Sequence, residues 1–379
     1  MSGGMELYLH MPFCVRKCAY CDFLSFPSGA KTQRMYAKRL MEDIGVMGKR
    51  YGEIPVETIF IGGGTPSVPD SGLIVEIMEH VRHAFHVADG AEISMEANPG
   101  TVTREKLTDY RKAGINRLSF GLQSANDREL KLLGRIHTWA EFLESFTLAR
   151  ECGFANLNID LMSALPGQTC ESWKETLSRV TDLDPEHISA YSLIIEEGTP
   201  FGERYGSEEG RKLLPDEDSE REMYHETKRF LKDCGYERYE ISNYAKPGRE
   251  CRHNIGYWTG VPYLGLGLGA SSYLDGCRFT VNPDMKQYLE EKPGMFTDIE
   301  KLTKKDMEEE FFYVGLRMTA GVSLSEFERR FGISAKEVYP GLMETFVKEK
   351  AARFEGDRFV LTDYGLDVSN YIMAQFLQD

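Results

Sequence analysis

The stretch Leu7-Tyr8-Leu9-His10-Met11-Pro12-Phe13-Cys14-Val15-Arg16-Lys17-Cys18-Ala19-Tyr20-Cys21 runs from a short apolar segment directly into three closely spaced cysteines. Its first part, Leu7–Phe13, is predicted to be a buried β-strand, because it is largely apolar and ends at a polar loop. The three cysteines are therefore expected on a loop that follows the first strand.

The order of strand, loop and helix recurs through the first half of the chain. Further strands are predicted at Thr58–Ile61, Glu92–Glu96, Arg117–Gln123, Asn156–Leu161 and His187–Ile194. Amphipathic helices are predicted between the strands, at Lys31–Lys49, Gly72–Phe85, Arg104–Ala113, Trp139–Cys152 and Glu171–Thr181. Strands that alternate with helices form parallel sheets with right-handed crossovers. Because a complete barrel needs about eight such units, the sequence predicts an α/β fold with a partial (β/α)6 barrel, and a doubly wound sheet is the alternative.

The alternation ends near residue 200, where the charge-dense segment Ser207–Arg221 is expected to be solvated. Strands are predicted at Glu237–Tyr244 and Tyr263–Tyr273, and Pro283–Lys305 reads as a linker or a surface helix. We therefore expect a barrel over residues 1–245 and a connecting segment over residues 246–305.

Residues 306–379 show a different pattern. Helices near Met307–Met318, Leu324–Phe331 and Lys336–Glu349 precede a hairpin at Ala352–Leu361 and a closing helix to Leu377. This order predicts a small C-terminal α+β domain that is winged-helix-like.

The charge of the chain argues against nucleic-acid binding. Its 379 residues include 45 Lys and Arg against 60 Asp and Glu, a formal net charge of −15, and such a surface repels phosphate backbones. No apolar run approaches the roughly 18 residues of a membrane-spanning helix, and the N-terminus lacks the features of a signal peptide. We expect a cytoplasmic protein, for which any membrane association would be peripheral.

Three of the eight cysteines, Cys14, Cys18 and Cys21, fall within eight residues. This spacing lets a loop wrap one small centre that prefers sulfur ligands. Three thiolates would leave one iron of a four-iron cluster open to a small molecule. A structural zinc ion with His10 or Asp22 as fourth ligand, or three unrelated thiols, are the alternatives.

Several polar or glycine residues follow the predicted strands. Gly62-Gly63-Gly64-Thr65-Pro66 comes after the second strand, and its glycines would allow a close approach to a ligand or simply form a tight turn. Glu96, Gln123, Arg135 and Asp160 lie at or near the ends of the next three strands. Because the carboxyl ends of parallel strands converge on one cleft, these side chains are candidates for a shared ligand site, although each alone could be a helix cap or a surface group.

The segment Tyr8–Phe23 resembles the start of radical S-adenosylmethionine (SAM) proteins, and more narrowly the group of oxygen-independent coproporphyrinogen III oxidases and HemW-type haem chaperones. The resemblance covers nearly the whole chain. It implies a [4Fe–4S] cluster on Cys14, Cys18 and Cys21. It also implies a SAM site, and the candidate SAM-binding residues are Tyr8, Tyr20, Gly63, Gly64, Thr65, Glu96, Gln123, Arg135 and Asp160.

Two features favour the chaperones within this group. Oxidases carry a further cysteine where this chain has Phe23, and they have a longer N-terminal extension. The stretch His253-Asn254-Ile255-Gly256-Tyr257-Trp258 is typical of the chaperones, in which the histidine is the proposed haem contact. An exposed His253 could coordinate haem iron, whereas an ordinary loop histidine is the alternative.

The resemblance thus predicts a haem chaperone that binds a [4Fe–4S] cluster, SAM and haem and delivers haem to apo-haemoproteins. A coproporphyrinogen III oxidase is the alternative function. A winged-helix nucleic-acid binder is the rival from another class, but Lys336–Glu349 has no dense basic face. The C-terminal domain is expected to cover the open side of the barrel or to dock a recipient of haem.

Overall fold

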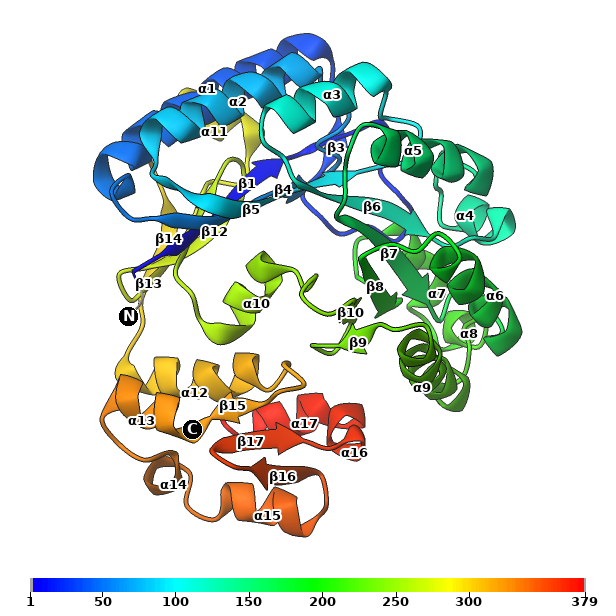
Figure 1. Ribbon diagram of the computed structural model, residues 1–379, viewed down its shortest axis with the longest axis vertical. Helices are drawn as coiled ribbons and strands as arrows, with labels where there is room; N and C mark the ends of the chain where they lie inside the picture. The colour runs from blue at the N-terminus through cyan, green and yellow to red at the C-terminus, as the bar shows by residue number, and fades with distance from the viewer. Residues whose placement is uncertain (1–2, 378–379) are drawn as a thin grey trace.

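A curved sheet of twelve strands forms the larger part of the molecule, as seen in the computed structural model, which describes residues 3–377 (Figure 1). Its central strands are parallel and lie in chain order. They are β1 (Met5–Met11), β4 (Val56–Gly63), β5 (Val87–Ala97), β6 (Arg117–Gln123), β7 (Leu157–Ser163) and β8 (His187–Ser192). The six predicted strands and the partial barrel are therefore confirmed.

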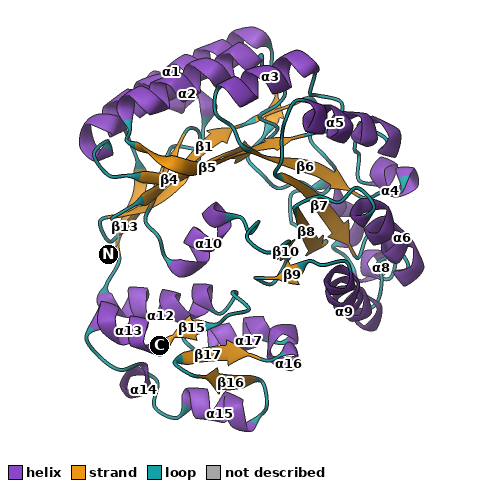
Figure 2. Ribbon diagram, viewed as in Figure 1, coloured by secondary structure: helices purple, strands orange, loops and turns teal. Residues whose placement is uncertain are grey.

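The helices that connect these strands cover the outer, convex side of the sheet (Figure 2). They are α1 (Ala30–Tyr51), α2 (Ser71–Ala84), α3 (Arg104–Lys112), the short α4 (Asp127–Leu132), α5 (Trp139–Glu151) and α6 (Cys170–Thr181). Local capping signals fix where they begin: the Asp70 side chain accepts the Gly72 N–H, and Thr138 and Glu141 form a capping box.

Side chains alternate along the strands between an apolar outer face and a polar inner face. In β1, Leu7 and Leu9 are buried in the core, whereas the intervening Tyr8 borders a cavity on the concave side. In β6, Leu118 and Phe120 join the same core, whereas Arg117 and Ser119 line that cavity. This period of two leaves the concave side of the barrel with polar groups that can bind a ligand.

Residues 246–305 do not form a separate connecting segment. The strand β11 (Tyr263–Leu266) pairs in parallel with β1, and β12 (Ser271–Leu274), β13 (Cys277–Thr280) and β14 (Thr297–Lys301) extend the same sheet with antiparallel pairing. The single strand predicted at Tyr263–Tyr273 is two strands, because Gly267 and Gly269 adopt positive φ values of 95° and 67° and turn the chain. The other sheet edge carries β10 (Asn243–Ala245) and β9 (Glu237–Arg238).

The charge-dense segment Ser207–Arg221 follows α7 (Pro200–Tyr205) and is partly helical. It contains α8 (Glu208–Arg211) and the start of α9 (Glu217–Asp233). The Asp216 side chain caps α9 by accepting the Ser219 N–H. Most residues of Ser207–Arg221 are exposed, as predicted. Beyond this segment, Met223 and Leu231 of α9 pack against the barrel core.

The C-terminal domain has its own apolar core and lies on the open side of the barrel (Figure 1). Its elements are α12 (Lys304–Gly315), β15 (Val322–Ser323), α13 (Leu324–Phe331), α14 (Ala335–Val338), α15 (Leu342–Lys348), β16 (Ala352–Glu355), β17 (Arg358–Leu361), α16 (Asp363–Asp367) and α17 (Ser369–Ala374). The three strands pair in the order β15-β17-β16, so the domain has the predicted winged-helix-like arrangement. The helix predicted at Lys336–Glu349 is split in two, because Pro340 and the left-handed Gly341 interrupt it.

Among residues 3–377, no helix is long and apolar enough to cross a membrane.

Candidate functional site

The cysteine loop leaves the barrel after β1 and is fixed at both ends. Its start, β2 (Phe13–Cys14), pairs with β3 (Phe26–Pro27) beyond the third cysteine. In the middle of the loop, the Ala19 N–H donates to the Leu133 carbonyl at 3.0 Å, and the Ala19 carbonyl accepts the Phe201 N–H at 2.9 Å. The loop is therefore positioned by the segments after α4 and at the start of α7, which the sequence analysis did not connect with it.

A chain of polar contacts joins two of the cysteines. The Cys14 sulfur lies 3.6 Å from the Thr65 hydroxyl, which accepts a hydrogen bond from the Asn98 amide at 2.7 Å. The Arg135 guanidinium donates to the Asn98 side-chain oxygen at 2.6 Å and to the Cys18 sulfur at 3.5 Å. Thr65 and Arg135 were predicted as ligand residues, whereas Asn98, which links them, was not.

The donor set suits a centre that prefers sulfur ligands. The three thiols are unpaired and partly exposed, and thiolates are the usual protein ligands of iron–sulfur clusters. His10, a candidate fourth zinc ligand, is engaged elsewhere, since its Nδ1 contacts the Tyr8 hydroxyl at 2.9 Å and its Nε2 contacts the Leu24 carbonyl at 2.9 Å. Within residues 3–377, no three His, Cys, Asp or Glu side chains converge on a single metal-ion position. The three thiols supply sulfur ligands of the kind that an iron–sulfur cluster requires.

The glycines at the end of β4, Gly63 and Gly64, bring two backbone segments together. Gly63 has φ of 113°, and a Cβ there would lie 2.4 Å from the His10 ring. A Cβ on Gly64 would lie 2.9 Å from the Phe13 carbonyl oxygen, and the Gly64 and Thr65 N–H groups donate to the Met11 and Phe13 carbonyls. Part of the reason for glycine here is therefore close packing against the chain that leads into Cys14.

The predicted carboxyl groups face each other at the strand ends. Burial, with the neighbouring Asp160 as a smaller cause, raises the pKa of Glu96 to about 8, although the Gly63 N–H donates to its Oε2 at 3.0 Å. Burial also raises the pKa of Asp160, whose oxygens accept hydrogen bonds from Ser119 at 2.8 Å and Asn158 at 2.7 Å. Gln123 ends β6 with a left-handed φ of 74°, a conformation that costs about 1–3 kcal/mol and is common at ligand sites.

One cavity of about 220 Å³ lies inside the barrel and connects two groups of predicted residues. Its lining consists of Tyr8, Phe60, Glu96, Arg117, Ser119, Asn158, Asp160, Ser189, Tyr191, His253, Asn254 and Tyr257. Tyr8, Glu96 and Asp160 are candidate SAM residues, whereas His253 is the candidate haem residue. Tyr20, Gln123 and Arg135 do not line it; Tyr20 instead packs near Phe201.

The histidine motif forms the helix α10 (Arg252–Thr259), which lies on the concave side of the sheet (Figure 1). His253 is only 1% exposed, so the expectation of an exposed histidine is wrong. Its Nδ1 contacts the Thr58 hydroxyl at 2.7 Å and its Nε2 contacts the Tyr257 hydroxyl at 3.0 Å. Burial, followed by the nearby Arg117, lowers the pKa of His253 to about 3, and the imidazole is therefore neutral.

Two glutamates hold α10 in the barrel. The Glu92 carboxylate accepts the backbone N–H groups of Arg252 and His253, each at 3.3 Å, and so satisfies the helix N-terminus. Glu6 faces Gly256, where a Cβ would lie 1.9 Å from the Glu6 Oε1. Burial raises the pKa of Glu6 to about 9, so a protonated Glu6 beside a neutral His253 forms no ion pair despite their 3.8 Å separation.

The C-terminal domain contacts the other side of α10. The Arg317 guanidinium lies over the Trp258 ring at 4.4 Å, and Arg330 donates to the Thr259 carbonyl at 3.1 Å. The domain also contacts α9 and the residues after β9, since Lys228 pairs with Asp363 and the Thr319 N–H donates to the Tyr239 carbonyl at 3.0 Å. It therefore covers the open side of the barrel through both regions.

The fold and the cysteine loop define a class of protein. A family model of the radical SAM superfamily matches residues 8–180, and a model of the HemN C-terminal domain matches residues 302–368. The solved structure of coproporphyrinogen III oxidase (HemN) from Escherichia coli, described as a radical SAM enzyme, has the same fold, with a TM-score of 0.85 and 24% sequence identity over 99% of this chain and 90% of that one.

Sequence relatives narrow the class further. The chain is 35% identical to the haem chaperone HemW of Bacillus subtilis over 374 residues, which cover 98% of each protein. It is 34% identical to HemW of Escherichia coli over 382 residues, which cover 99% of this chain and 98% of the relative. The chain belongs to the HemW family of haem chaperones within the radical SAM superfamily.

Proposed function

We propose that this protein binds a [4Fe–4S] cluster, SAM and haem, and that it delivers haem to apo-haemoproteins in the cytoplasm. The observation that carries the proposal is the single cavity that has Glu96 and Asp160 at one part of its lining and His253, Asn254 and Tyr257 at another. The family membership supports the same function, because the relatives are haem chaperones.

Cys14, Cys18 and Cys21 are the residues that would hold the cluster, which when bound supplies an electron for reductive cleavage of SAM. The Arg135 N–H at the Cys18 sulfur stabilises negative charge on that sulfur. Glu96 and Asp160 offer carboxyl oxygens to the ammonium and hydroxyl groups of SAM.

Haem ligation by His253 requires a change at the ring nitrogens. Both nitrogens are occupied by hydroxyl groups, those of Thr58 and Tyr257. The cavity is also small: its volume is about 220 Å³, whereas ligand pockets generally measure about 300–1,000 Å³. We propose that α10 shifts when haem enters and that the Tyr257 hydroxyl leaves Nε2 free for iron.

Two substitutions test this ligand assignment. His253→Ala should weaken haem binding by at least tenfold, because the iron ligand is removed. Tyr257→Phe should strengthen haem binding, because no hydrogen bond to the imidazole has to be broken before the iron can bind. Haem titrations followed by the Soret band measure both effects. His80→Ala, on the exposed face of α2, is the matched control. Equal affinity in the wild type and in His253→Ala would place the iron ligand elsewhere.

A parallel assay on the anaerobically reconstituted protein tests the function itself. One half supplies coproporphyrinogen III, SAM and a reductant, and the other half titrates haem and then adds an apo-haemoprotein. Haem binding and transfer without decarboxylation would support the chaperone. Decarboxylation would establish the alternative, an oxygen-independent coproporphyrinogen III oxidase, for which the shared fold gives the only support.

The C-terminal domain is proposed to serve this function rather than to bind nucleic acid. Its helix α13, for example, pairs Arg329 and Arg330 with Glu326 instead of presenting free cations. We propose that the recipient of haem docks beside this domain, where α10 reaches the surface.

A further inference from the structure

Arg117 is a buried cation that the rest of the protein leaves without a counter-ion. It is 2% exposed and begins β6. Within the described part of the chain, its side chain makes one long hydrogen bond, from Nη1 to the Ser94 hydroxyl at 3.5 Å, and its buried Nε meets no acceptor. Among residues 3–377, no carboxylate lies within ion-pair distance of it, although Glu92 and Asp160 are its nearest acidic neighbours. Because a guanidinium stays charged in proteins, such a group calls for an explanation.

The two carboxylates nearest to Arg117 are engaged elsewhere. Glu92 accepts the N-terminal N–H groups of α10 and the Cys251 thiol. Asp160 accepts hydrogen bonds from Ser119 and Asn158. Both stabilise the charge of Arg117 from a distance, but neither occupies the fork of donors that a guanidinium offers to a planar anion.

The guanidinium borders the cavity that joins the candidate SAM and haem residues. Ser119, Asn158, Ser189 and Asn254 lie on the same lining and add further polar groups around it. His253 is close enough for the charge of Arg117 to lower the pKa of its imidazole. A ligand that reaches His253 through this cavity therefore passes beside Arg117, whose guanidinium has N–H donors that are not hydrogen-bonded within the protein.

We propose that Arg117 binds a carboxylate of the tetrapyrrole and thereby anchors it inside the barrel, on the inner side of α10. The inference rests on the proposed function, in that a tetrapyrrole is taken to enter this cavity. It adds a recognition element that does not involve iron: the site selects ring systems with free acid side chains. SAM also carries a carboxylate, which is the other source of the same chemistry.

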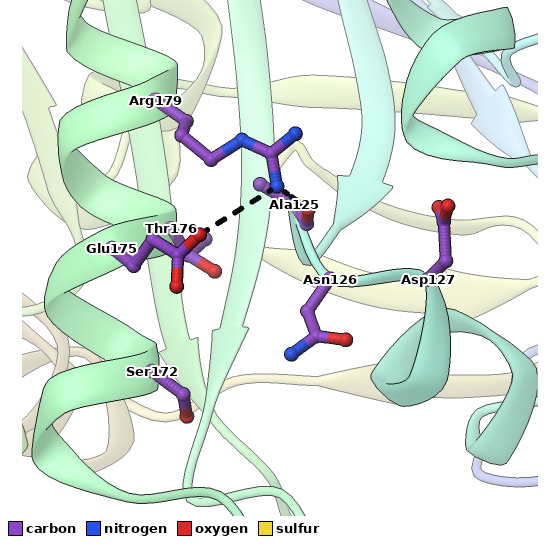
Figure 3. Close-up of a pocket in the computed structure, with 7 residues that line it drawn as sticks. All are labelled: Ala125, Asn126, Asp127, Ser172, Glu175, Thr176 and Arg179. Carbon is purple, nitrogen blue, oxygen red and sulfur yellow. Dashed lines mark hydrogen bonds and ion pairs between the residues drawn. The ribbon is translucent and has the colours of Figure 1, made fainter.

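A second arginine provides a matched control. Arg179 borders a polar surface pocket of about 210 Å³ between α4 and α6 (Figure 3). In contrast to Arg117, it is fully engaged: it donates to the Ala125 carbonyl at 2.6 Å, stacks on the Trp139 ring at 4.4 Å and approaches Glu175 at 4.0 Å. Its replacement removes the same charge without touching the cavity.

The experiment compares the wild type with Arg117→Gln, Arg117→Lys and Arg179→Gln as full-length proteins. Each is titrated with protoporphyrin IX and with its dimethyl ester, and separately with haem and with SAM. A charge-assisted hydrogen bond contributes about 1.5–3 kcal/mol, so the wild type should prefer the free acid roughly 10- to 100-fold. Arg117→Gln should abolish this preference, Arg117→Lys should restore part of it, and Arg179→Gln should leave it unchanged.

The acid-to-ester ratio is measured within each variant, so partial unfolding of a variant does not alter it. An unchanged ratio in Arg117→Gln would overturn the inference, as would an equal affinity of the wild type for acid and ester. Loss of SAM affinity with an unchanged ratio would assign Arg117 to SAM instead. The metal-free porphyrin separates this test from the chaperone assay. An acid preference without haem transfer would support the role of Arg117 and contradict the proposed function. Haem transfer without an acid preference would support the proposed function and overturn the role of Arg117.

Discussion

The cysteine loop and the α10 region of the candidate site are built by different means. At the strand ends, the three cysteines lie on a single loop of the chain, and their thiols are partly exposed and available to a ligand. At α10, the site is assembled from residues far apart in sequence, since His253 contacts Thr58 across 195 positions and Glu92 reaches α10 across about 160. There, both ring nitrogens of His253 and the first N–H groups of α10 already have partners within the protein.

This difference shows where each part of the site gets its stability. The cysteine loop is positioned by backbone hydrogen bonds to Leu133 and Phe201, and its side chains carry little of the fold. The α10 part depends on buried side-chain hydrogen bonds, each of which contributes about 1 kcal/mol and costs more when one partner is removed. Substitutions in the first part should therefore change ligand content, whereas substitutions in the second should change stability as well.

The largest effect is expected from Cys18→Ala. Because Cys18 is one of three proposed cluster ligands, the reconstituted variant should lose essentially all cluster iron. It should also lose the absorbance at about 400 nm that arises from thiolate-to-iron charge transfer. The fold should remain, since the Cys18 thiol is not part of a buried core. Iron analysis and circular dichroism measure the two quantities.

Cys234→Ala is the matched control for that experiment. Cys234 is exposed at the end of α9, away from the loop, and its replacement should leave the iron content unchanged. Full iron retention in Cys18→Ala would contradict the assignment of the cluster to this loop.

The sequence was sufficient for the parts of the molecule that are specified locally. The repeated strands and helices predicted the barrel, and the spacing of Cys14, Cys18 and Cys21 predicted the loop. The sequence was not sufficient where contacts between residues far apart in the chain determine the structure. Nothing near His253 in the chain indicates that Thr58 and Tyr257 will bury it, and nothing near Arg117 indicates that it lacks a partner. The strand β11 was assigned to a connecting segment, because its pairing with β1 joins residues about 257 positions apart.

A substitution that disturbs only the α10 part should have the next largest effect. In Gly256→Ala, the added Cβ would overlap the buried Glu6 side chain, and overpacking of this kind costs about 1–3 kcal/mol. We expect a lower free energy of unfolding and weaker haem binding, with unchanged cluster iron. Chemical denaturation and haem titration measure these effects.

Gly45→Ala is the control for the added methyl group. Gly45 lies within α1, where a Cβ would meet no atom within 4 Å, so alanine should leave the protein unchanged or stabilise it by up to about 1 kcal/mol. Equal stability of Gly256→Ala and the wild type would mean that α10 is not packed against Glu6 in solution.

The effect most specific to α10 is a change in the pH dependence of stability in Glu6→Gln. The pKa of Glu6 is about 9 in the folded protein, against 4.5 as its ordinary value, because burial disfavours the carboxylate. Between these pKa values the folded chain binds the proton and the unfolded chain releases it, so the free energy of unfolding falls as pH rises through this window. Glutamine is neutral throughout and removes this contribution. The variant should nearly match the wild type at pH 5 and exceed it at pH 8.5, with a difference that grows by up to about 1.4 kcal/mol per pH unit across this window. Thermal unfolding of the metal-free chain at both pH values measures the difference, and parallel pH profiles for the two proteins would show that Glu6 is hydrated and that α10 does not seal this part of the barrel.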